Sequence, residues 1–280
     1  STLYYWSVEA VGNFISDGLI GSETTVPLTF AGGIKTVGAG GDFENLTTAF
    51  AYINSNGLLG DVELQLIAGY PAIPETYPIL TCNKVATSTF NVKVYPTVAG
   101  LSITSANATG TLLLDNAENV TFDGRINQVG ASVLDISNTG AGYAVQFVND
   151  ASNNTLQYVT INSGNVTATS GTIVFGGSNK STGNDNNLID NCLIGRSTTS
   201  PRFAIYSAGT SGTVNNNGNT ISNSSIFDYF AAGVNSAGIY LASNSSDWTI
   251  TGNKFYQTQA RIVTSGSTHR GIHITTSNGS

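Results

Sequence analysis

The chain has 280 residues, a net charge of −7 and only 10% charged residues, against about 25% in a typical soluble domain. It contains no run of Lys and Arg and no apolar stretch of about 18 residues, which argues against a nucleic-acid groove and a membrane span. The polar surface must therefore come from Asn, Ser, Thr and Gly, which suit tight turns and neutral hydrogen-bonded faces.

The chain begins with a segment that lacks regular patterning. We predict that residues 1–35 are irregular and that Tyr4–Trp6 and Val26–Phe30 pack along the next region or join a preceding segment. Residues 36–280 form one domain in this prediction. The chain opens with Ser1 and contains no Met, as expected of a mature chain whose export signal was removed. We therefore expect a secreted or cell-surface protein.

One helix is predicted over Asp42–Ile53, where Leu46, Ala49, Phe50 and Ile53 recur at helical spacing. Asp42 is expected to cap its first turn, and Gly57 is expected to end it. Such a helix can cover the first unpaired edge of a stack of strands.

Aliphatic pairs with a spacing of two recur at intervals of 28 to 39 residues. This spacing places both side chains of a pair on one face of a strand, and we expect that face to point inward. The pairs are Leu64/Leu66, Val92/Val94, Val120/Phe122, Val159/Ile161, Cys192/Ile194, Ser224/Ile226 and Asn253/Phe255.

A second aliphatic series recurs at intervals of 28 to 34 residues, in step with the first. Two series with one period require a coil that contains several strands per turn. We therefore predict an all-β fold, a right-handed parallel β-helix of about seven coils with an N-terminal capping helix. The second series contains Val145/Phe147, Ile173/Phe175, Ile205, Ile239/Leu241 and Ile272/Ile274.

Asn-rich pairs stand between the predicted strands, and aliphatic residues follow them at matching distances. Asn tolerates a positive φ, which a sharp corner of the coil needs. These runs are Asn153-Asn154, Asn186-Asn187, Asn215-Asn216-Asn217 and Gly218-Asn219, and the aliphatic residues are Leu156, Ile189, Ile221 and Ile250. Cys82 and Cys192 fall several coils apart, so we expect two free, buried thiols.

The stretch Thr36–Phe50, with its Gly41-Asp42-Phe43 turn before the helix, resembles the N-terminal signature of the pectin-lyase-like β-helices, pectin methylesterases included. The Asn-Cys-Leu-Ile rung at 191–194 is similar to the coils of that superfamily. The composition also resembles that of large secreted surface proteins of Bacteroidetes. These resemblances imply a parallel β-helix over residues 36–280 and an extracellular setting.

The catalytic sets of the resembled enzymes have no match in this sequence. Gly171–Gly176 resembles an esterase strand but lacks its Asp, and the second esterase carboxylate has no counterpart. A polygalacturonase-like Gly-His-Gly is absent, Arg261-Ile262-Val263 lacks the expected Lys, and no adjacent Asp pair suggests a lyase. We therefore assign no catalytic residue.

Two outward tyrosines are the best candidates for binding. Tyr206 and Tyr240 occupy matching positions on consecutive coils of the second series, and Trp248 follows shortly after. Stacked aromatic side chains offer an apolar face and a polar edge to sugar rings or to a protein surface. We predict Tyr206, Tyr240 and Trp248 as binding residues, with a carbohydrate or a surface protein as the partner.

Other polar groups favour ordinary structural roles. His269 and His273 are expected on a solvated surface, and Asp123, Arg125 and Asp135 are expected to form a surface ion pair rather than an acid–base group. The aspartates at 185, 190, 228 and 247 fall in turns of successive coils and favour turn formation over Ca²⁺ binding. No metal ligand is assigned, and Ca²⁺ is the one cofactor that stays open.

Two functions are compatible with these sequence features. The first is a non-enzymatic module, such as an adhesin, a stalk or an exported cargo domain, that presents a polar face dotted with aromatic residues. The alternative is a polysaccharide-active lyase, hydrolase or esterase with an unrecognised site. The last coil, from Gly271, is incomplete, so we expect further chain or a partner to cover the C-terminal end of the stack.

Overall fold

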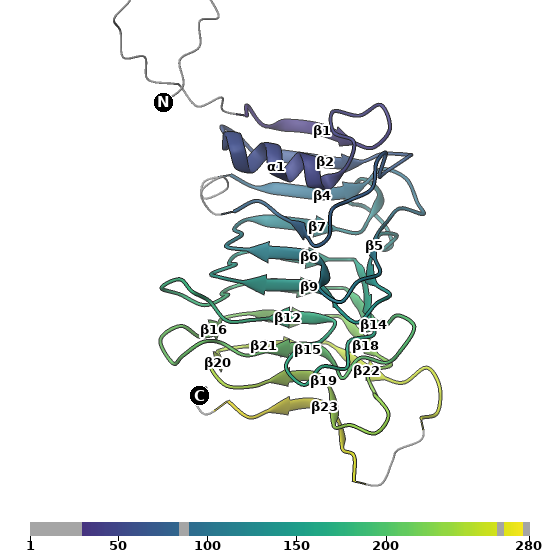
Figure 1. The fold of residues 1–280 in the computed structure, drawn as a ribbon, viewed down its shortest axis with the longest axis vertical. Coiled ribbons are helices and arrows are strands. Elements are labelled where there is room, and N and C mark those ends of the chain that lie inside the picture. The colour runs from purple at the N-terminus through teal and green to yellow at the C-terminus, as the bar shows by residue number, and fades with distance from the viewer. Residues whose placement is uncertain (1–29, 84–89, 262–265, 277–280) are drawn as a thin grey trace, which may run out of the picture.

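The computed structural model describes residues 30–83, 90–261 and 266–276, and the chain winds through them as a parallel β-helix (Figure 1). Each coil passes in turn through three parallel sheets, which we call sheets I, II and III. All three sheets pair strands from successive coils, and sheet III contributes one strand to each of seven coils. The predicted fold class is confirmed.

The strands of each sheet follow one another down the stack. Sheet I contains β1 (Gly33–Val37), β2 (Val62–Leu66), β4 (Val92–Pro96), β7 (Val120–Asp123), β10 (Thr155–Gln157), β13 (Leu188–Asp190), β17 (Thr220–Ser222) and β21 (Thr249–Thr251). Sheet II contains β5 (Ser102–Ser105), β8 (Asp135–Asn138), β11 (Thr160–Ser163), β14 (Leu193–Arg196), β18 (Ser225–Phe227) and β22 (Lys254–Tyr256). Sheet III contains β3 (Ile79–Leu80), β6 (Gly110–Asp115), β9 (Tyr143–Val148), β12 (Ile173–Phe175), β15 (Phe203–Ser207), β19 (Ser236–Leu241) and β23 (His269–Ile274). The short strands β16 (Asn216–Asn217) and β20 (Ser245–Ser246) pair beside them, and η2 (Ile126–Gln128) is a short 3₁₀ turn.

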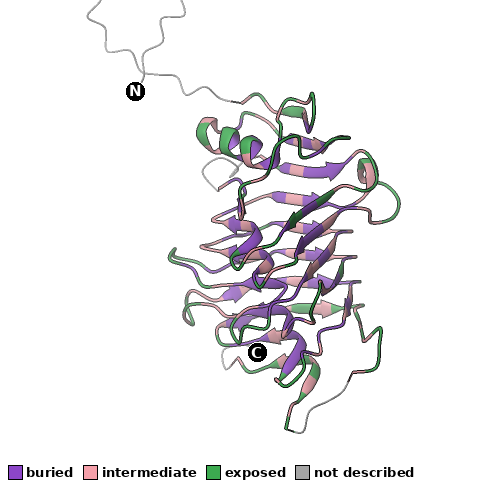
Figure 2. Ribbon diagram, turned by 45° about the vertical axis from the view of Figure 1, so that its right-hand side comes forward, coloured by how far each residue is buried: buried purple, intermediate pink, exposed green. Residues whose placement is uncertain are grey.

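The core is a column of aliphatic side chains inside the three sheets. On sheet III, Val145 pairs with Ile173, Ile173 with Ile205, and the same register continues to Ile239 and Ile272. All of these except Ile272 are fully buried, and Figure 2 shows the buried strand positions running down the stack. The predicted second series is therefore confirmed as one inward-facing column. Each coil buries the apolar residues of the coil before it, which supplies most of the favourable free energy of folding.

The predicted first series is wrong as a single column, although its described members face inward. Phe122 pairs with Leu156 on sheet I, whereas Ile161 pairs with Ile136 and Ile194 on sheet II. The longest predicted interval, of 39 residues, is the point where the prediction moved from one sheet to the next. The register also slips at the start, because Leu64 pairs with Val94 and not with Val92.

The corners before sheet I combine a left-handed residue with a buried amide. Asn153 and Asn186 have φ values of 58° and 56°. The Asn that follows each of them points inward and is buried. The two residues of each predicted Asn pair therefore have different roles at the corner. The first residue turns the chain, and the second satisfies backbone groups that the turn leaves inside.

These inward amides form a ladder. Oδ1 of Asn187 accepts hydrogen bonds from the backbone N–H and the side-chain amide of Asn154, both at 3.0 Å. Oδ1 of Asn219 accepts the same two bonds from Asn187, at 2.9 and 3.0 Å. The ladder thus joins three successive coils through groups that have no access to water. Asn184 and Asn216 repeat this arrangement closer to sheet III, at 3.0 and 2.9 Å.

The corner between sheets I and II holds a second polar stack. The backbone N–H of Cys192 donates to Oγ of Ser224, and the N–H of Ser224 donates to Oδ1 of Asn253. Cys192 and Cys82 are both free and buried, as predicted. Burial raises the pKa of the Cys192 thiol to about 12 and raises that of Cys82 further.

The helix α1 (Leu46–Asn56) lies beside β3 and covers the first edge of sheet III (Figure 1). It buries Leu46, Ala49, Phe50 and Ile53, and Gly57 ends it with a φ of 67°, as predicted. The predicted cap Asp42 is wrong. Oδ1 of Asn45 accepts from the N–H of Thr48, and Asp42 instead bonds to Thr36.

The carboxylate of Glu75 completes the start of the helix. Its two oxygens accept the N–H groups of Leu46 and Thr47, both at 2.8 Å. A negative charge at this position also favours the helix dipole. The chain after β2 is thereby fixed to the helix that precedes it.

Both ends of the stack leave strand edges unpaired within the described residues. At the C-terminal end, Ile272 and Ile274 of β23 are 41% and 58% exposed. What covers this end stays a prediction. Residues 1–29 lie outside the described residues, so the predicted packing of the N-terminal segment is not tested, and β1 spans the predicted boundary at residue 36. The helix that the structure describes is too short to cross a bilayer.

We predict that Asn187→Ala destabilises the fold by roughly 3 kcal/mol. The change removes the acceptor for two buried N–H groups of Asn154 and the donor to the carbonyl of Ala151. Urea denaturation followed by circular dichroism measures the loss. Asn179→Ala is the matched control, because this exposed side chain lies on the neighbouring turn. Equal stability of the two variants would show that the ladder contributes nothing.

We also predict that neither thiol reacts with a maleimide at pH 8 in the folded protein. Burial keeps both groups in the neutral form, and the thiolate is the nucleophile. Mass spectrometry should show no adduct before denaturation and two adducts per chain in guanidinium chloride. An adduct on Cys192 in the native protein would contradict the burial of this corner.

Candidate binding site

The outward face of sheet III carries the predicted tyrosines. Tyr206 pairs directly with Tyr240, and Tyr240 pairs with His273 on the last coil. Adjacent strands lie about 4.8 Å apart, so each ring is placed next to the ring on the following coil. The structure thus brings Tyr206 and Tyr240 together, as the prediction of matching outward positions requires.

Two consecutive inward residues in β15 allow a fourth ring to join this face. Ala204 and Ile205 are both fully buried, which leaves the side chains on either side of them, Phe203 and Tyr206, to face outward. The sequence prediction missed Phe203 because strict alternation places it on the inward face, together with Ile205. We call Phe203, Tyr206, Tyr240 and His273 the aromatic cluster.

The rings of the aromatic cluster are in direct contact. The Tyr240 ring lies 4.9 Å from that of Phe203 and 5.7 Å from that of Tyr206, measured between ring centroids. The imidazole of His273 stacks on Tyr240 at 4.6 Å with only 12° between the ring planes. Contacts of this kind stabilise by about 1 kcal/mol each beyond the burial of area.

The four rings differ in their access to solvent. Phe203 and Tyr206 are only 4% and 7% exposed, so they form the floor of the cluster. Tyr240 and His273 are half-buried and present part of their rings to solvent. Burial raises the pKa of Tyr206, and the neighbouring Tyr240 raises it further. A ligand would therefore meet Tyr240 and His273 first, and Tyr206 supports them from below.

Polar groups surround the exposed rings. The Arg202 guanidinium lies 5.4 Å from the Phe203 ring and donates through Nε to the carbonyl of Asn235. Thr275 donates through its hydroxyl to the Tyr240 hydroxyl at 3.2 Å. Burial, followed by the charge of nearby Arg270, lowers the pKa of His273. The imidazole is therefore neutral at pH 7 and offers both a donor and an acceptor.

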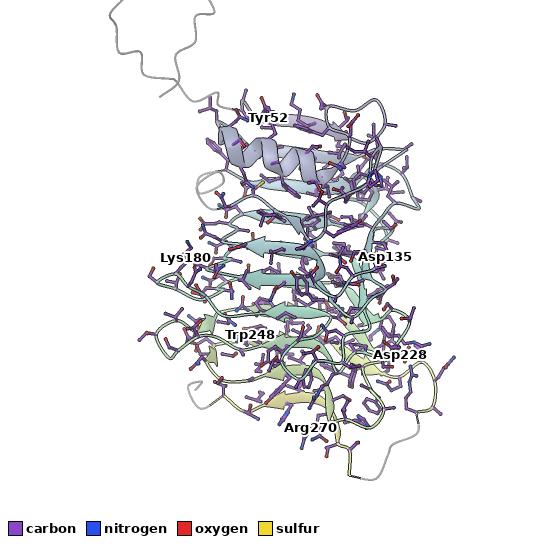
Figure 3. All side chains as sticks on the ribbon, in the orientation of Figure 1. Tyr52, Asp135, Lys180, Asp228, Trp248 and Arg270 are labelled. Atoms are coloured by element: carbon purple, nitrogen blue, oxygen red, sulfur yellow. The ribbon has the colours of Figure 1, made fainter. Side chains whose placement is uncertain are left out.

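The predicted binding residue Trp248 does not join this cluster. Its ring packs edge-on against the buried Phe175 at 4.8 Å, and its indole N–H donates to the carbonyl of Asn216 at 2.9 Å. Thr249 pairs with Thr220, so Trp248 takes the position on the next coil that matches the buried ladder residue Asn219. The geometry gives Trp248 a role in closing the ladder. Figure 3 labels it apart from Arg270, which marks the last coil of sheet III.

The expected ion pair forms between Asp123 and Arg125, but it is not a surface pair, because the Asp123 carboxylate is fully buried. Arg125 donates to both carboxylate oxygens at 2.9 and 2.6 Å, and its guanidinium stacks 4.0 Å from the Tyr158 ring. Asp123 is fully buried and also accepts from Gln157, so it is a structural anchor. Burial raises the pKa of Asp135, one of whose oxygens has no hydrogen-bond partner in the described structure.

The histidines and turn aspartates are also placed. His269 stacks on Phe230 and bonds to Ser236. The prediction that His269 and His273 lie on a solvated surface is therefore wrong, because both rings are stacked on an aromatic neighbour. Asp190 accepts bonds from three neighbouring side chains, which are Asn191, Ser222 and Asn223. Within the ranges that the structure describes, no group of three acidic, His or Cys residues could hold a metal ion. Ca²⁺ binding stays an untested prediction.

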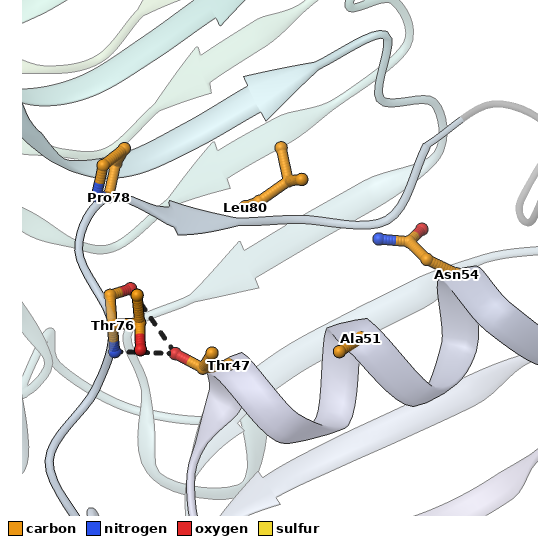
Figure 4. A pocket seen from close by; sticks show the side chains of 6 residues that line it. All are labelled: Thr47, Ala51, Asn54, Thr76, Pro78 and Leu80. Atoms are coloured by element: carbon orange, nitrogen blue, oxygen red, sulfur yellow. Dashed lines mark hydrogen bonds between the residues drawn. The ribbon is translucent and has the colours of Figure 1, made fainter.

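A small pocket between α1 and β3 is lined mainly by non-ionisable groups (Figure 4). Thr47 and Thr76 bond to one another across its mouth, and Leu80 forms one wall. It contains no titratable side chain and lies far from sheet III's aromatic cluster in the stack. We do not assign it a function.

Comparisons with known proteins add little. No family model and no curated protein matches this chain. The crystal structure of pectate lyase Pel9A is similar over 90% of this chain and 79% of that enzyme's chain, at 13% sequence identity and a TM-score of 0.33. A likeness at this level supports no inference about activity, and the fold described above depends on the strand pairing itself.

We predict that stability falls as the pH falls from 7 to 5.5, and that His273→Gln reduces this fall. The folded state lowers the pKa of His273, so the unfolded chain binds the proton more readily. The stabilisation from neutral His273 is fully present above the unfolded pKa of about 6.5, and it is lost as the pH falls through the lower folded pKa. Urea denaturation at several pH values measures the slope. An unchanged slope in the variant would show that the His273 stack does not sense protonation.

Proposed function

We propose that this chain is a non-catalytic extracellular binding module that presents the aromatic cluster of sheet III to a carbohydrate. The observation that carries the proposal is the half-exposed, parallel stack of Tyr240 and His273 on a floor of buried aromatic rings. A sugar ring has an apolar face of similar size and a rim of hydroxyl groups. The cluster offers the matching arrangement, because Arg202, Thr275 and neutral His273 place hydrogen-bonding groups at its edges.

The position of the cluster supports binding rather than simple core formation. The strands β15 and β19, which carry Phe203, Tyr206 and Tyr240, pair on both sides in sheet III, and β23, which carries His273, pairs with β19. Such a platform loses little conformational entropy when a ligand binds, because its rings are already held in place. A protein surface with a flat apolar spot is the other kind of partner that this arrangement fits.

A polysaccharide-active enzyme is the second candidate, and one observation favours it. Asp135 lies on sheet II, and burial raises the pKa of its carboxyl group, as a general acid requires. One of its oxygens has no hydrogen-bond partner among the described residues. Release of reducing ends from a polysaccharide panel, lost in Asp135→Asn, would replace the binding proposal with a catalytic one.

We predict that Tyr240→Ala weakens carbohydrate binding about tenfold or more, because it removes the exposed ring and the stacking partner of His273. A glycan array would identify a binding sugar, and calorimetry would compare the variants with it. Tyr52→Ala is the matched control, since this exposed tyrosine lies on α1 at the opposite end of the stack (Figure 3). Equal affinity of the two variants would exclude the aromatic cluster as the site.

A further inference from the structure

Positive charge gathers in the last coils of an otherwise acidic chain. Residues 196–280 contain five Lys and Arg side chains against two Asp, a net charge of +3. The remaining part therefore has a net charge of −10 within the total of −7. Four of the five arginines of the chain fall in this C-terminal part, at positions 196, 202, 261 and 270. Two of them converge on one point beside sheet II.

That point is the buried carboxylate of Asp228, which is 2% exposed. Nε of Arg196 lies 3.2 Å from one oxygen, and Nη2 of Arg261 lies 3.4 Å from the other. Two guanidinium groups thus share one carboxylate, which among the described residues leaves one positive charge without an acidic partner at this place. Figure 3 labels Asp228 at the side of the lower coils, away from Arg270.

The carboxylate of Asp228 is already engaged by other donors. The backbone N–H of Thr258 donates to it at 2.8 Å, and the Thr258 hydroxyl donates at 2.6 Å. Burial alone would raise the pKa of Asp228, but the bonds from Thr258 and the contact with Arg261 outweigh it and hold the pKa below its usual value. Asp228 is therefore ionised, and Thr258 already occupies two of the roughly four lone-pair sites of its carboxylate.

The buried donors of Arg261 are not satisfied by hydrogen bonds. Within the part of the chain that the structure describes, Nε makes none, and Nη2 makes only the 3.4 Å ion-pair contact with Asp228. Buried donors of a charged group are nearly always satisfied, so this pair indicates a missing acceptor. The Arg196 side chain is partly exposed, and its Nε is paired with Asp228. The forks of both arginines are suited to an oxyanion, which accepts several such bonds at once.

An exposed aromatic pair lies next to the two arginines. Phe227 precedes Asp228 and stacks on Tyr256 at 5.6 Å with 17° between the rings, and Tyr256 is 42% exposed. Gly195, which precedes Arg196, leaves the space that the Phe227 ring fills, since a Cβ there would approach the ring to 2.6 Å. Arg196, Phe227 and Tyr256 thus come from three adjacent strands of sheet II, and Arg261 joins them through its contact with Asp228.

We propose that Arg196 and Arg261 form a binding site for a carboxylate or sulfate group, and that Tyr256 is the wall on which the adjoining ring of the ligand stacks. The site lies on sheet II and does not depend on the aromatic cluster of sheet III. The excess charge attracts the anion, and the unpaired donors of Arg261 hold it. Asp228 fixes the two arginines and at the same time limits the strength of binding.

Titration calorimetry with sodium sulfate and with sodium glucuronate, at constant ionic strength set by NaCl, tests the proposal. We expect saturable binding of at least one of the two anions and at least tenfold weaker binding in Arg261→Gln. Lys180→Gln, which removes an exposed charge elsewhere, is the matched control and should bind like the wild type. Equal binding by these two variants, or no saturable binding of either anion, would overturn the site.

Two further variants keep the test independent of folding. Asp228→Asn removes the competing carboxylate and should strengthen anion binding, whereas a merely structural role for the cluster predicts no gain. Tyr256→Ala should weaken glucuronate binding and leave sulfate binding unchanged, which separates the ring from the charge. Sulfate has no sugar ring, so the sulfate titration reports on this site alone, and a failure of the sheet III proposal would not affect it. Circular dichroism confirms that each variant is folded.

Discussion

The buried asparagine ladder is the interaction on which the rest of this structure depends. Each coil must turn sharply, and each turn places backbone N–H and C=O groups inside a column that excludes water. An unsatisfied group there would cost about 1–3 kcal/mol, and the cost would recur on every coil. Asn154, Asn187 and Asn219 bond to these buried groups. Because a side-chain amide both donates and accepts, each of these residues satisfies polar groups in its own coil and in the neighbouring one. A hydrophobic column alone would not hold the coils in register.

The register between coils also fixes which outward side chains lie next to one another. Once Ile205 stacks on Ile239, the outward neighbours Tyr206 and Tyr240 must also stack, whether or not they serve a function. The same geometry places Phe227 beside Tyr256 on sheet II. A parallel β-helix therefore builds rows of like side chains at about 4.8 Å spacing from single repeated positions. Recognition of an extended ligand requires few additional residues, because the scaffold has already fixed the distance between its contacts.

The sequence alone predicts the part of the structure that repeats, and fails where the repeat is broken. The sheet III column, the inward face of α1 and the two buried thiols follow from periodicity and composition. The columns of sheets I and II were mixed because both carry an aliphatic residue flanked by polar ones, within about five residues of each other. Phe203 was missed because two consecutive residues, Ala204 and Ile205, both face inward, which breaks the alternation. The pairing of Arg261 with Asp228 joins residues in irregular turns, where no spacing rule applies.

The scarcity of charge makes the positions of the arginines informative. In a chain with 10 cationic side chains among 280 residues, the solvent-facing surface relies on neutral amides and hydroxyls. An Arg held close to a buried carboxylate is costly to desolvate, and a second Arg at the same place adds repulsion without a second partner. Such an arrangement is stable on its own only if something else returns free energy. One guanidinium balances the charge of Asp228, and Thr258 donates two further bonds to it, so the second guanidinium is not needed to neutralise it. A bound anion would offset the repulsion between Arg196 and Arg261, and this offset would contribute to the affinity of the site for the anion.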